Sequence, residues 1–169
     1  MKDFLNQIYI TKAELHEYTQ QDGSKSKVLL VRIPYRSLVP FQKSSSEVIA
    51  QLEKKFNWPT IVSAVRNIQS KSAVTHASQM RPRSRTLTAV HQATLEDVVF
   101  PATITGKHTR ISADGKKATK IFIDPLDKEI VEDKAEAMAA VYQKLTTHKV
   151  TIGFSKPTSF QLKKIAEKK

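Results

Sequence analysis

The sequence lacks cysteine entirely and has only four glycines among its 169 residues. Without cysteine the chain can form no disulfide, no thiolate zinc site and no cysteine nucleophile. The glycines are widely separated, at Gly23, Gly106, Gly115 and Gly153. This spacing builds neither a Walker loop nor a glycine-rich dinucleotide turn. Nucleotide hydrolysis by a P-loop is therefore excluded.

Other features associated with membranes, metals and catalysis are also missing. No apolar run approaches membrane-spanning length, and the start, MKDFLNQIY, has an early acid and no signal-peptide core. The five histidines show no metal-ligand spacing. Glu96 and Asp97 are adjacent on a predicted helix, so they point in different directions and we expect the pair to face solvent. These observations predict no enzyme activity, no catalytic residue, no metal or other cofactor, no small-molecule substrate and no membrane partner.

Positive charge is what the sequence has in excess. There are 28 Lys and Arg residues against 16 Asp and Glu, which gives a net charge of +12. Residues 61–126 hold +6 of this, and the segments on either side hold +3 each. So large an excess is self-repulsive in a folded protein, and a bound polyanion would neutralise it. The composition therefore favours nucleic acid as a partner.

The first part of the chain predicts a β-hairpin and a β-α-β unit. Apolar alternation in residues 7–18 and a β-rich run at 26–34 flank Asp22-Gly23, a pair that hairpin turns favour. A helix then extends to Trp58-Pro59, and its start is either Pro40 or a capping box at Ser44 and Glu47. Residues 60–65, TIVSAV, predict a second buried strand.

The rest of the chain predicts a loop, two helices, a second hairpin and a last strand. Residues 66–85 are polar and lack a period, so we expect a long basic surface loop. A helix follows, capped by Ser84 or Thr86 and stopped by Pro101, with its apolar positions on one side: Leu87, Val90, Thr94, Leu95 and Val98. Residues 102–124 predict a hairpin, 132–146 a helix with a stripe at Ala135, Met138, Tyr142 and Leu145, and 149–154 a strand. No internal repeat is evident.

Together these elements predict an α+β fold with a mixed, mostly antiparallel β-sheet flanked by helices. The length suits a single domain, which we place at residues 1–156. Residues 157–169 form a basic C-terminal tail whose lysines include Lys163, Lys164, Lys168 and Lys169.

Three arginines alternate immediately before the predicted central helix, in Arg81-Pro82-Arg83-Ser84-Arg85. In an extended conformation, which Pro82 favours, their guanidinium groups would lie along one side. One arginine side chain can donate two parallel hydrogen bonds to the oxygens of a phosphate, and a helix N-terminus offers backbone N–H groups to an anion. The pattern predicts contact with a nucleic-acid backbone, although charge alone is also typical of a nuclear-import signal.

A longer block around these arginines resembles a known family. The stretch RPRSRTLTAVHQATLEDVVFPATITGKHTRI is similar to the signature of the eukaryote-specific small-subunit (40S) ribosomal protein seven family, which is unrelated to the bacterial protein of that numeral. The segments FQK, LEKKF and VYQKLT match the family in order and spacing. The resemblance implies a structural constituent of the cytoplasmic small ribosomal subunit that binds ribosomal RNA, contacts neighbouring small-subunit proteins, supports subunit assembly and translation, and passes through the nucleolus.

The resemblance also implies where RNA binds. Carried over by position, the contacts are Arg81, Arg83, Arg85, Lys107 and Arg110. The complete set of predicted RNA-binding residues adds other basic positions of the loop and second hairpin, together with one serine: Arg66, Lys71, Ser84, Lys116, Lys117 and Lys120. Family members usually carry an additional N-terminal helical segment, so we expect contacts made through it to be absent or replaced. The alternative hypothesis is a free basic adaptor protein that uses its loop only for nuclear import.

Overall fold

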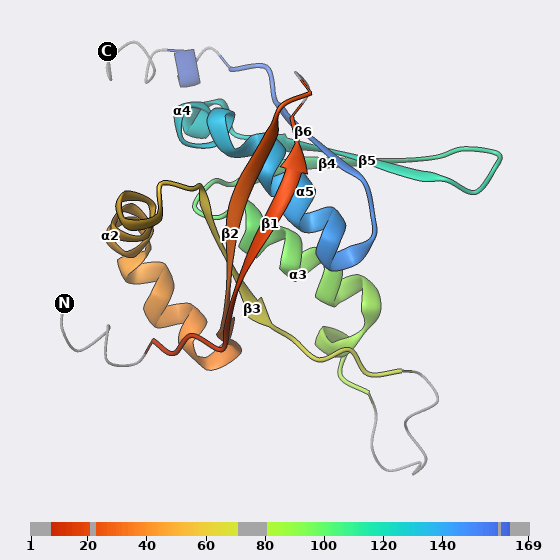
Figure 1. Cartoon of the computed structure of the whole chain (residues 1–169). Helices are drawn as coiled ribbons and strands as arrows, with labels where there is room; N and C mark the ends of the chain where they lie inside the picture. Colours follow the sequence, from red (N-terminus) through yellow and green to blue (C-terminus); the bar gives the residue numbers. More distant parts are fainter. Residues whose placement is uncertain (1–7, 21–22, 71–80, 159, 163–169) are drawn as a thin grey trace. The chain divides into compact units, whose positions relative to one another are not determined.

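The structure is a computed structural model that describes residues 8–20, 23–70, 81–158 and 160–162. It confirms the α+β class, with six strands in two mixed, three-stranded sheets and not in one (Figure 1). By their internal contacts the residues form two compact units. One contains the chain up to His16 and Val28–Val98, and the other contains Glu17–Lys27 and the chain from Val99 onward. The domain limits at 156 and 157 stay a prediction.

The first sheet has the order β1-β2-β3, with β1 at Lys12–Thr19, β2 at Lys25–Pro34 and β3 at Thr60–Val65. Helix α2, Leu38–Phe56, connects β2 to β3, which run parallel as the predicted β-α-β unit requires. Its apolar side packs on one face of the sheet in a cluster of buried and partly buried side chains that includes Leu29, Val31, Ile33, Phe41, Val62 and Leu52. The predicted hairpin, helix and strand are therefore confirmed.

The predicted capping box of α2 is wrong. A 3-10 turn, η1 at Tyr35–Ser37, leads directly into the helix at Leu38, so Pro40 lies in the first turn. Ser44 is inside the helix, where its hydroxyl donates to the carbonyl of Pro40 at 3.3 Å. Proline is tolerated in the first turn because the N–H groups there have no partner within the helix. The earlier start lengthens the helix and brings Phe41 into the core.

The next helix after β3 is α3, Leu87–Val99. The central part of the predicted loop, residues 71–80, lies outside the described residues. Val90, Leu95 and Val98 are buried as expected, and Thr94 joins them, but Leu87 is 52% exposed. The first turn of α3 therefore faces solvent while its later turns pack in the core.

The second sheet has the order β4-β5-β6, with strands at Ile104–Ile111, Lys117–Ile123 and Val150–Phe154. β4 and β5 form the predicted antiparallel hairpin, whose turn includes Gly115 in the left-handed region at φ 76°. Between β5 and β6 lie the turn η4 (Pro125–Asp127), the short helix α4 (Lys128–Val131), the turn η5 (Glu132–Lys134) and the helix α5 (Ala135–Thr146). The buried face of α5 centres on Met138, Val141 and Tyr142. Ala135 and Leu145 are only partly buried, so the predicted stripe is displaced.

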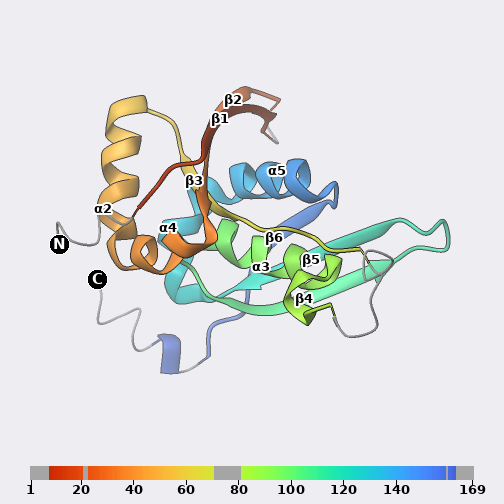
Figure 2. The same ribbon diagram turned by 90° about the horizontal axis from the view of Figure 1, so that it is seen from below.

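The two sheets are built by the same sequence of elements, so a structural repeat exists although the sequence analysis found none (Figure 2). In each, a hairpin is followed by a 3-10 turn, a helical segment and a strand parallel to the second hairpin strand. The helical segment is α2 in the first repeat, and α4, η5 and α5 in the second. Leu29 pairs with Thr60 and Thr119 pairs with Val150, a constant shift of 90 residues. The same shift relates η1 to η4 and Leu38 to Lys128, the starts of the following helices.

The helices of the two repeats also end alike. Asn57 and Thr147, again 90 residues apart, both adopt the left-handed conformation directly after their helix. Each N–H closes the last turn, on Glu53 and Gln143 respectively. The paired positions share conformation but little chemistry, which is why the repeat is not visible in the sequence.

Candidate nucleic-acid interface

Two hydrogen bonds join residues on either side of positions 71–80, close to the start of α3. The N–H of Gln69 donates to the carbonyl of Arg85 at 3.0 Å, and Nη1 of Arg81 donates to the carbonyl of Gln69 at 2.9 Å. These bonds bring positions 69, 81 and 85 together. Lys71, another predicted contact, lies outside the described residues.

The arginines do not form the extended row that their alternation suggested. Pro82 is extended, but Arg83–Arg85 form a 3-10 turn, η3, and Thr86 returns to the extended region. With about three residues per turn, neighbouring side chains in such a turn diverge around its axis. Arg83, Ser84 and Arg85 are all exposed. The guanidinium groups of Arg83 and Arg85 therefore spread into solvent, and neither forms an ion pair with a residue that the structure describes.

Thr86 connects this turn to α3. Its hydroxyl donates to the carbonyl of Arg83 at 2.7 Å, and its own carbonyl accepts from the N–H of Val90 at 2.9 Å. Thr86 thus occupies the predicted position directly before the helix, and Ser84 lies two residues earlier, within the 3-10 turn η3. The exposed first turn of α3, with Arg83 and Arg85 immediately before it, combines a helix dipole and two cations that all favour an anion.

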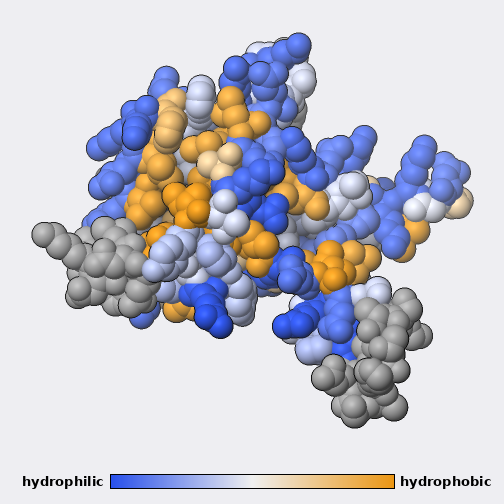
Figure 3. Space-filling view, turned by 60° about the horizontal axis from the view of Figure 1, so that its bottom comes forward, coloured by the Kyte–Doolittle hydropathy of each residue, from blue (hydrophilic) through white to orange (hydrophobic). Residues whose placement is uncertain are grey.

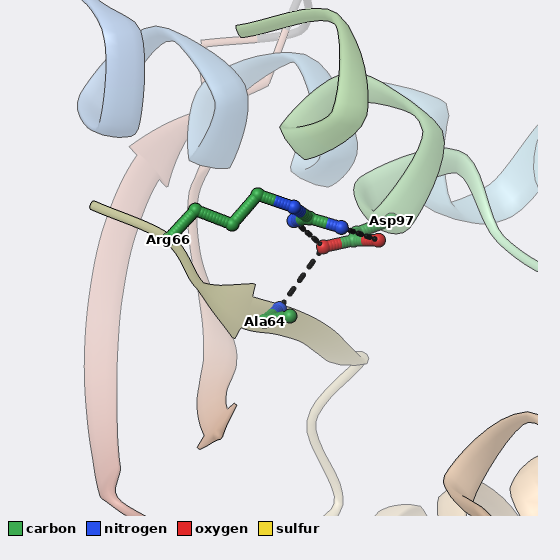
Figure 4. Close-up of polar contacts among 3 residues, drawn as sticks. All are labelled: Ala64, Arg66 and Asp97. Atoms are coloured by element: carbon green, nitrogen blue, oxygen red, sulfur yellow. Dashed lines mark hydrogen bonds and ion pairs between the residues drawn. The ribbon is translucent and has the colours of Figure 1, made fainter. Parts of the chain in front are cut away.

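Arg66 has a different environment from the other predicted contacts (Figure 4). Its Nη2 donates to Oδ1 of Asp97 at 2.9 Å, and its Nη1 forms a short contact with Oδ2 of the same carboxylate. Oδ2 also accepts the N–H of Ala64 at 3.0 Å. The guanidinium lies over the ring of Tyr35, 5.7 Å from its centroid. This arginine therefore ties the end of β3 to α3.

The expectation that Glu96 and Asp97 both face solvent is wrong for Asp97. Glu96 is exposed, but only 5% of the Asp97 side chain is accessible. Neighbours on a helix point in different directions, and here one of them points inward to the edge of β3. The hydrogen bond from Arg66 to Asp97 raises the pKa of Arg66, against the opposing effect of burial. Arg66 thus keeps its positive charge, and the carboxylate of Asp97 balances that charge within the protein.

The second basic surface is the β4–β5 hairpin, which extends beyond the part of β5 that β6 covers. It appears as a mainly hydrophilic arm at the right of Figure 3. All five of its predicted contacts are exposed: Lys107, Arg110, Lys116, Lys117 and Lys120. Residues paired across the strands share a face, and that face alternates along each strand. Arg110 and Lys120 are therefore on one face, Lys107 and Lys117 on the other, and Lys116 is beside the turn.

The hairpin also carries an aromatic residue, Phe122, that was not among the predicted site residues. Phe122 lies two positions from Lys120 and so on the same face. Its ring contacts His108 edge-on, with centroids 5.1 Å apart, and Nζ of Lys120 is 5.4 Å from its centroid. The alternation of Ala118, Lys120 and Phe122 was the available signal, but apolar residues on both arms hid which face is open.

Within the described residues, no group of His, Asp and Glu side chains is arranged to hold a metal ion. The helices of that part are all too short or too polar to cross a membrane.

Comparison with known proteins decides the family. The family model described as Ribosomal protein S7e matches residues 1–154. The chain belongs to the ribosomal protein S7e family. Among its relatives, the small ribosomal subunit protein eS7 of Avicennia marina is 41% identical over 155 residues, covering 91% of this chain and 79% of the relative. Small ribosomal subunit protein eS7z of Arabidopsis thaliana is 37% identical, and the match covers 91% of this chain and 78% of the relative. Small ribosomal subunit protein eS7 of Drosophila melanogaster is 39% identical, and the match covers 91% of this chain and 79% of the relative.

The S7e match includes both basic surfaces, the turn before α3 and the β4–β5 hairpin. It ends at Phe154, the last residue of β6, so the predicted tail lies beyond it. The resemblance inferred from the sequence is therefore confirmed at the level of the family.

Proposed function

We propose that the protein is a structural constituent of the small ribosomal subunit that binds ribosomal RNA through two basic surfaces. The first is formed by Arg83, Arg85 and the start of α3, with Arg81 at its base. The second is the β4–β5 hairpin, with Lys107, Arg110, Lys116, Lys117 and Lys120. Arg66 is left out of the RNA-contacting set, because its guanidinium is already engaged by Asp97.

Family membership is the observation that carries this proposal, because the S7e relatives are named as proteins of the small ribosomal subunit. The net charge of +12 supports it, since a phosphate backbone would neutralise such an excess. Neighbouring small-subunit proteins, a role in subunit assembly, residence in the cytoplasm and passage through the nucleolus belong to the same proposal.

Sedimentation of a tagged copy of the full chain through a gradient at moderate salt tests the proposal. A ribosomal constituent migrates with the small subunit and remains there after purification. A free basic adaptor, the competing hypothesis, remains near the top of the gradient. Recovery only in the light fractions would contradict the proposal.

A further inference from the structure

The outer face of the second sheet carries an aromatic ring between two glycines. Phe122 on β5 is directly opposite Gly106 on β4 and Gly153 on β6. A Cβ atom placed on Gly106 would lie 3.7 Å from Cδ2 of Phe122, so the ring occupies the space beside that glycine. A Cβ atom on Gly153 would lie 3.2 Å from Cε of Lys120. The two positions directly opposite the ring carry no side chain, His108 of β4 contacts the ring edge-on from the next row, and the aliphatic stem of Lys120 lies over Gly153.

Polar and basic side chains surround this ring. His108, Lys120 and Thr151 form the next row across the three strands, and Arg110 follows on the same face of β4. Together with Thr109, Ala118, Thr119 and Phe122 they line a hollow of about 500 Å³. The hollow therefore combines an aromatic surface, two basic side chains and hydroxyl groups.

The repeat shows that the fold does not require an open face here. In the first sheet, the positions 90 residues earlier than Lys120, Thr151 and Gly153 are Leu30, Ile61 and Ser63. These three residues are buried, with exposures of 0%, 3% and 1%. Arg32, the counterpart of Phe122, is partly buried, so three of these four positions are closed in the first sheet. In the second sheet, Lys120 and Thr151 are exposed and Phe122 and Gly153 are partly buried. The basic and aromatic composition of the open face therefore needs an explanation beyond folding.

From this arrangement we infer that the hollow binds one unpaired nucleotide of RNA, with its base stacked on Phe122 and its phosphate held by Arg110 and Lys120. Proteins bind unpaired RNA through aromatic side chains that stack on bases and cations that hold the backbone. Nζ of Lys120 lies over the ring in the free protein, and its exposed, flexible stem allows the ammonium group to move to a phosphate. This inference deepens the proposed function and rests on it.

Binding of the full-length protein to a short single-stranded RNA, and to the duplex formed with its complement, tests the inference. Phe122→Leu keeps an apolar side chain but removes the ring, and Phe122→Tyr keeps the ring. We expect Phe122→Leu to weaken single-strand binding about 5- to 100-fold, because stacking on one aromatic side chain has an effect of that size. Binding of Phe122→Tyr should stay close to that of the unchanged protein. Duplex affinity should not change, because paired bases cannot stack on the ring.

A second variant and the salt dependence separate the possible outcomes. Gly106→Val keeps Phe122 but places a branched side chain against its ring, so we expect the same selective loss with the single strand. Neither Gly106→Val nor Phe122→Leu removes charge, so the slope of log affinity against log salt should be unchanged. If both variants bind the single strand as tightly as the unchanged protein, the inference is wrong while RNA binding itself stands. If the unchanged protein binds neither RNA, both the inference and the proposed function fail.

Discussion

At the scale of single residues, the contact between Arg66 and Asp97 shows how one carboxylate changes the role of a basic side chain. The carboxylate of Asp97 accepts hydrogen bonds from two guanidinium nitrogens of Arg66 and from the N–H of Ala64 on β3. This group of three residues connects two elements that are far apart in the sequence. Arg66 is therefore assigned to stability, whereas Arg83 and Arg85 remain available to phosphates.

Replacing Asp97 by alanine should destabilise the protein by roughly 3–5 kcal/mol, because the guanidinium of Arg66 would remain largely buried without its partner. Only 14% of the Arg66 side chain is exposed, so water can compensate little of the loss. Urea unfolding of the variant measures the change. Glu96→Ala is the matched control, since Glu96 is adjacent but exposed, and it should change stability by less than about 0.5 kcal/mol. Equal effects of the two substitutions would contradict this account of Asp97.

Tyr142 makes stability depend on pH at alkaline values. Burial raises the pKa of its phenol, while a hydrogen bond with Thr146 acts in the opposite direction. In the unfolded chain the phenol loses its proton near pH ~10, whereas the folded protein retains it to higher pH. Stability should therefore fall as the pH rises above about 10, and less steeply for Tyr142→Phe. Phenolate absorbance of the unchanged protein and of Tyr142→Phe provides the check: the difference between the two titration curves should develop only above pH ~10, and a difference that develops at lower pH would contradict the prediction.

At the scale of elements, the sequence predicted most strands and helices because their signals are local. The turns at Gly23 and Gly115, the apolar run of β2 and the strand at 60–65 all correspond to observed elements. Pairing between distant segments was less predictable. Nothing in the local pattern shows that β6 runs parallel to β5, or that the strands divide into two sheets, since these choices depend on contacts across the whole fold.

In the candidate site, too, features with a local signal were predictable and features that depend on distant contacts were not. The basic positions were identifiable from charge and from the resemblance, and all those in the hairpin are exposed. The pairing of Arg66 with Asp97 was not identifiable, because it depends on which side of α3 meets β3. The position of Phe122 between two glycines depends on the register of three strands and was equally hidden.

Removing the chain from Pro157 onward should lower the melting temperature by less than about 4 °C. Gln161 donates to Oδ1 of Asp124 at 3.1 Å, but Phe160 and Leu162 are 64% and 53% exposed. A single hydrogen bond of this kind stabilises by about 1 kcal/mol, which corresponds to about 2–4 °C in a chain of this size. Calorimetry of the truncated chain provides the test, with Gln161→Ala in the full chain as the control. A much larger loss on truncation would show that the tail packs as part of the domain.

At the scale of the whole molecule, the basic side chains differ in whether an acidic side chain of the protein neutralises them. Arg66 is neutralised within the protein, while the turn before α3 and the β4–β5 hairpin expose their cations to solvent. We therefore expect particular arginines to contact phosphate, and we do not expect net charge alone to explain RNA binding.

The salt dependence of ribosomal RNA binding shows whether Arg81, Arg83 and Arg85 contact phosphate. Each phosphate contact contributes about 0.7–0.9 to the slope of log affinity against log salt. Replacing Arg81, Arg83 and Arg85 together by alanine should reduce that slope by about 1.4–2.7, because two or three contacts are lost. The matched control replaces three exposed lysines of α2, Lys43, Lys54 and Lys55, and removes the same charge. We expect an unchanged slope for this control; an unchanged slope for the arginine variant, or equal reductions in both, would contradict the assignment of phosphate contacts to these three arginines.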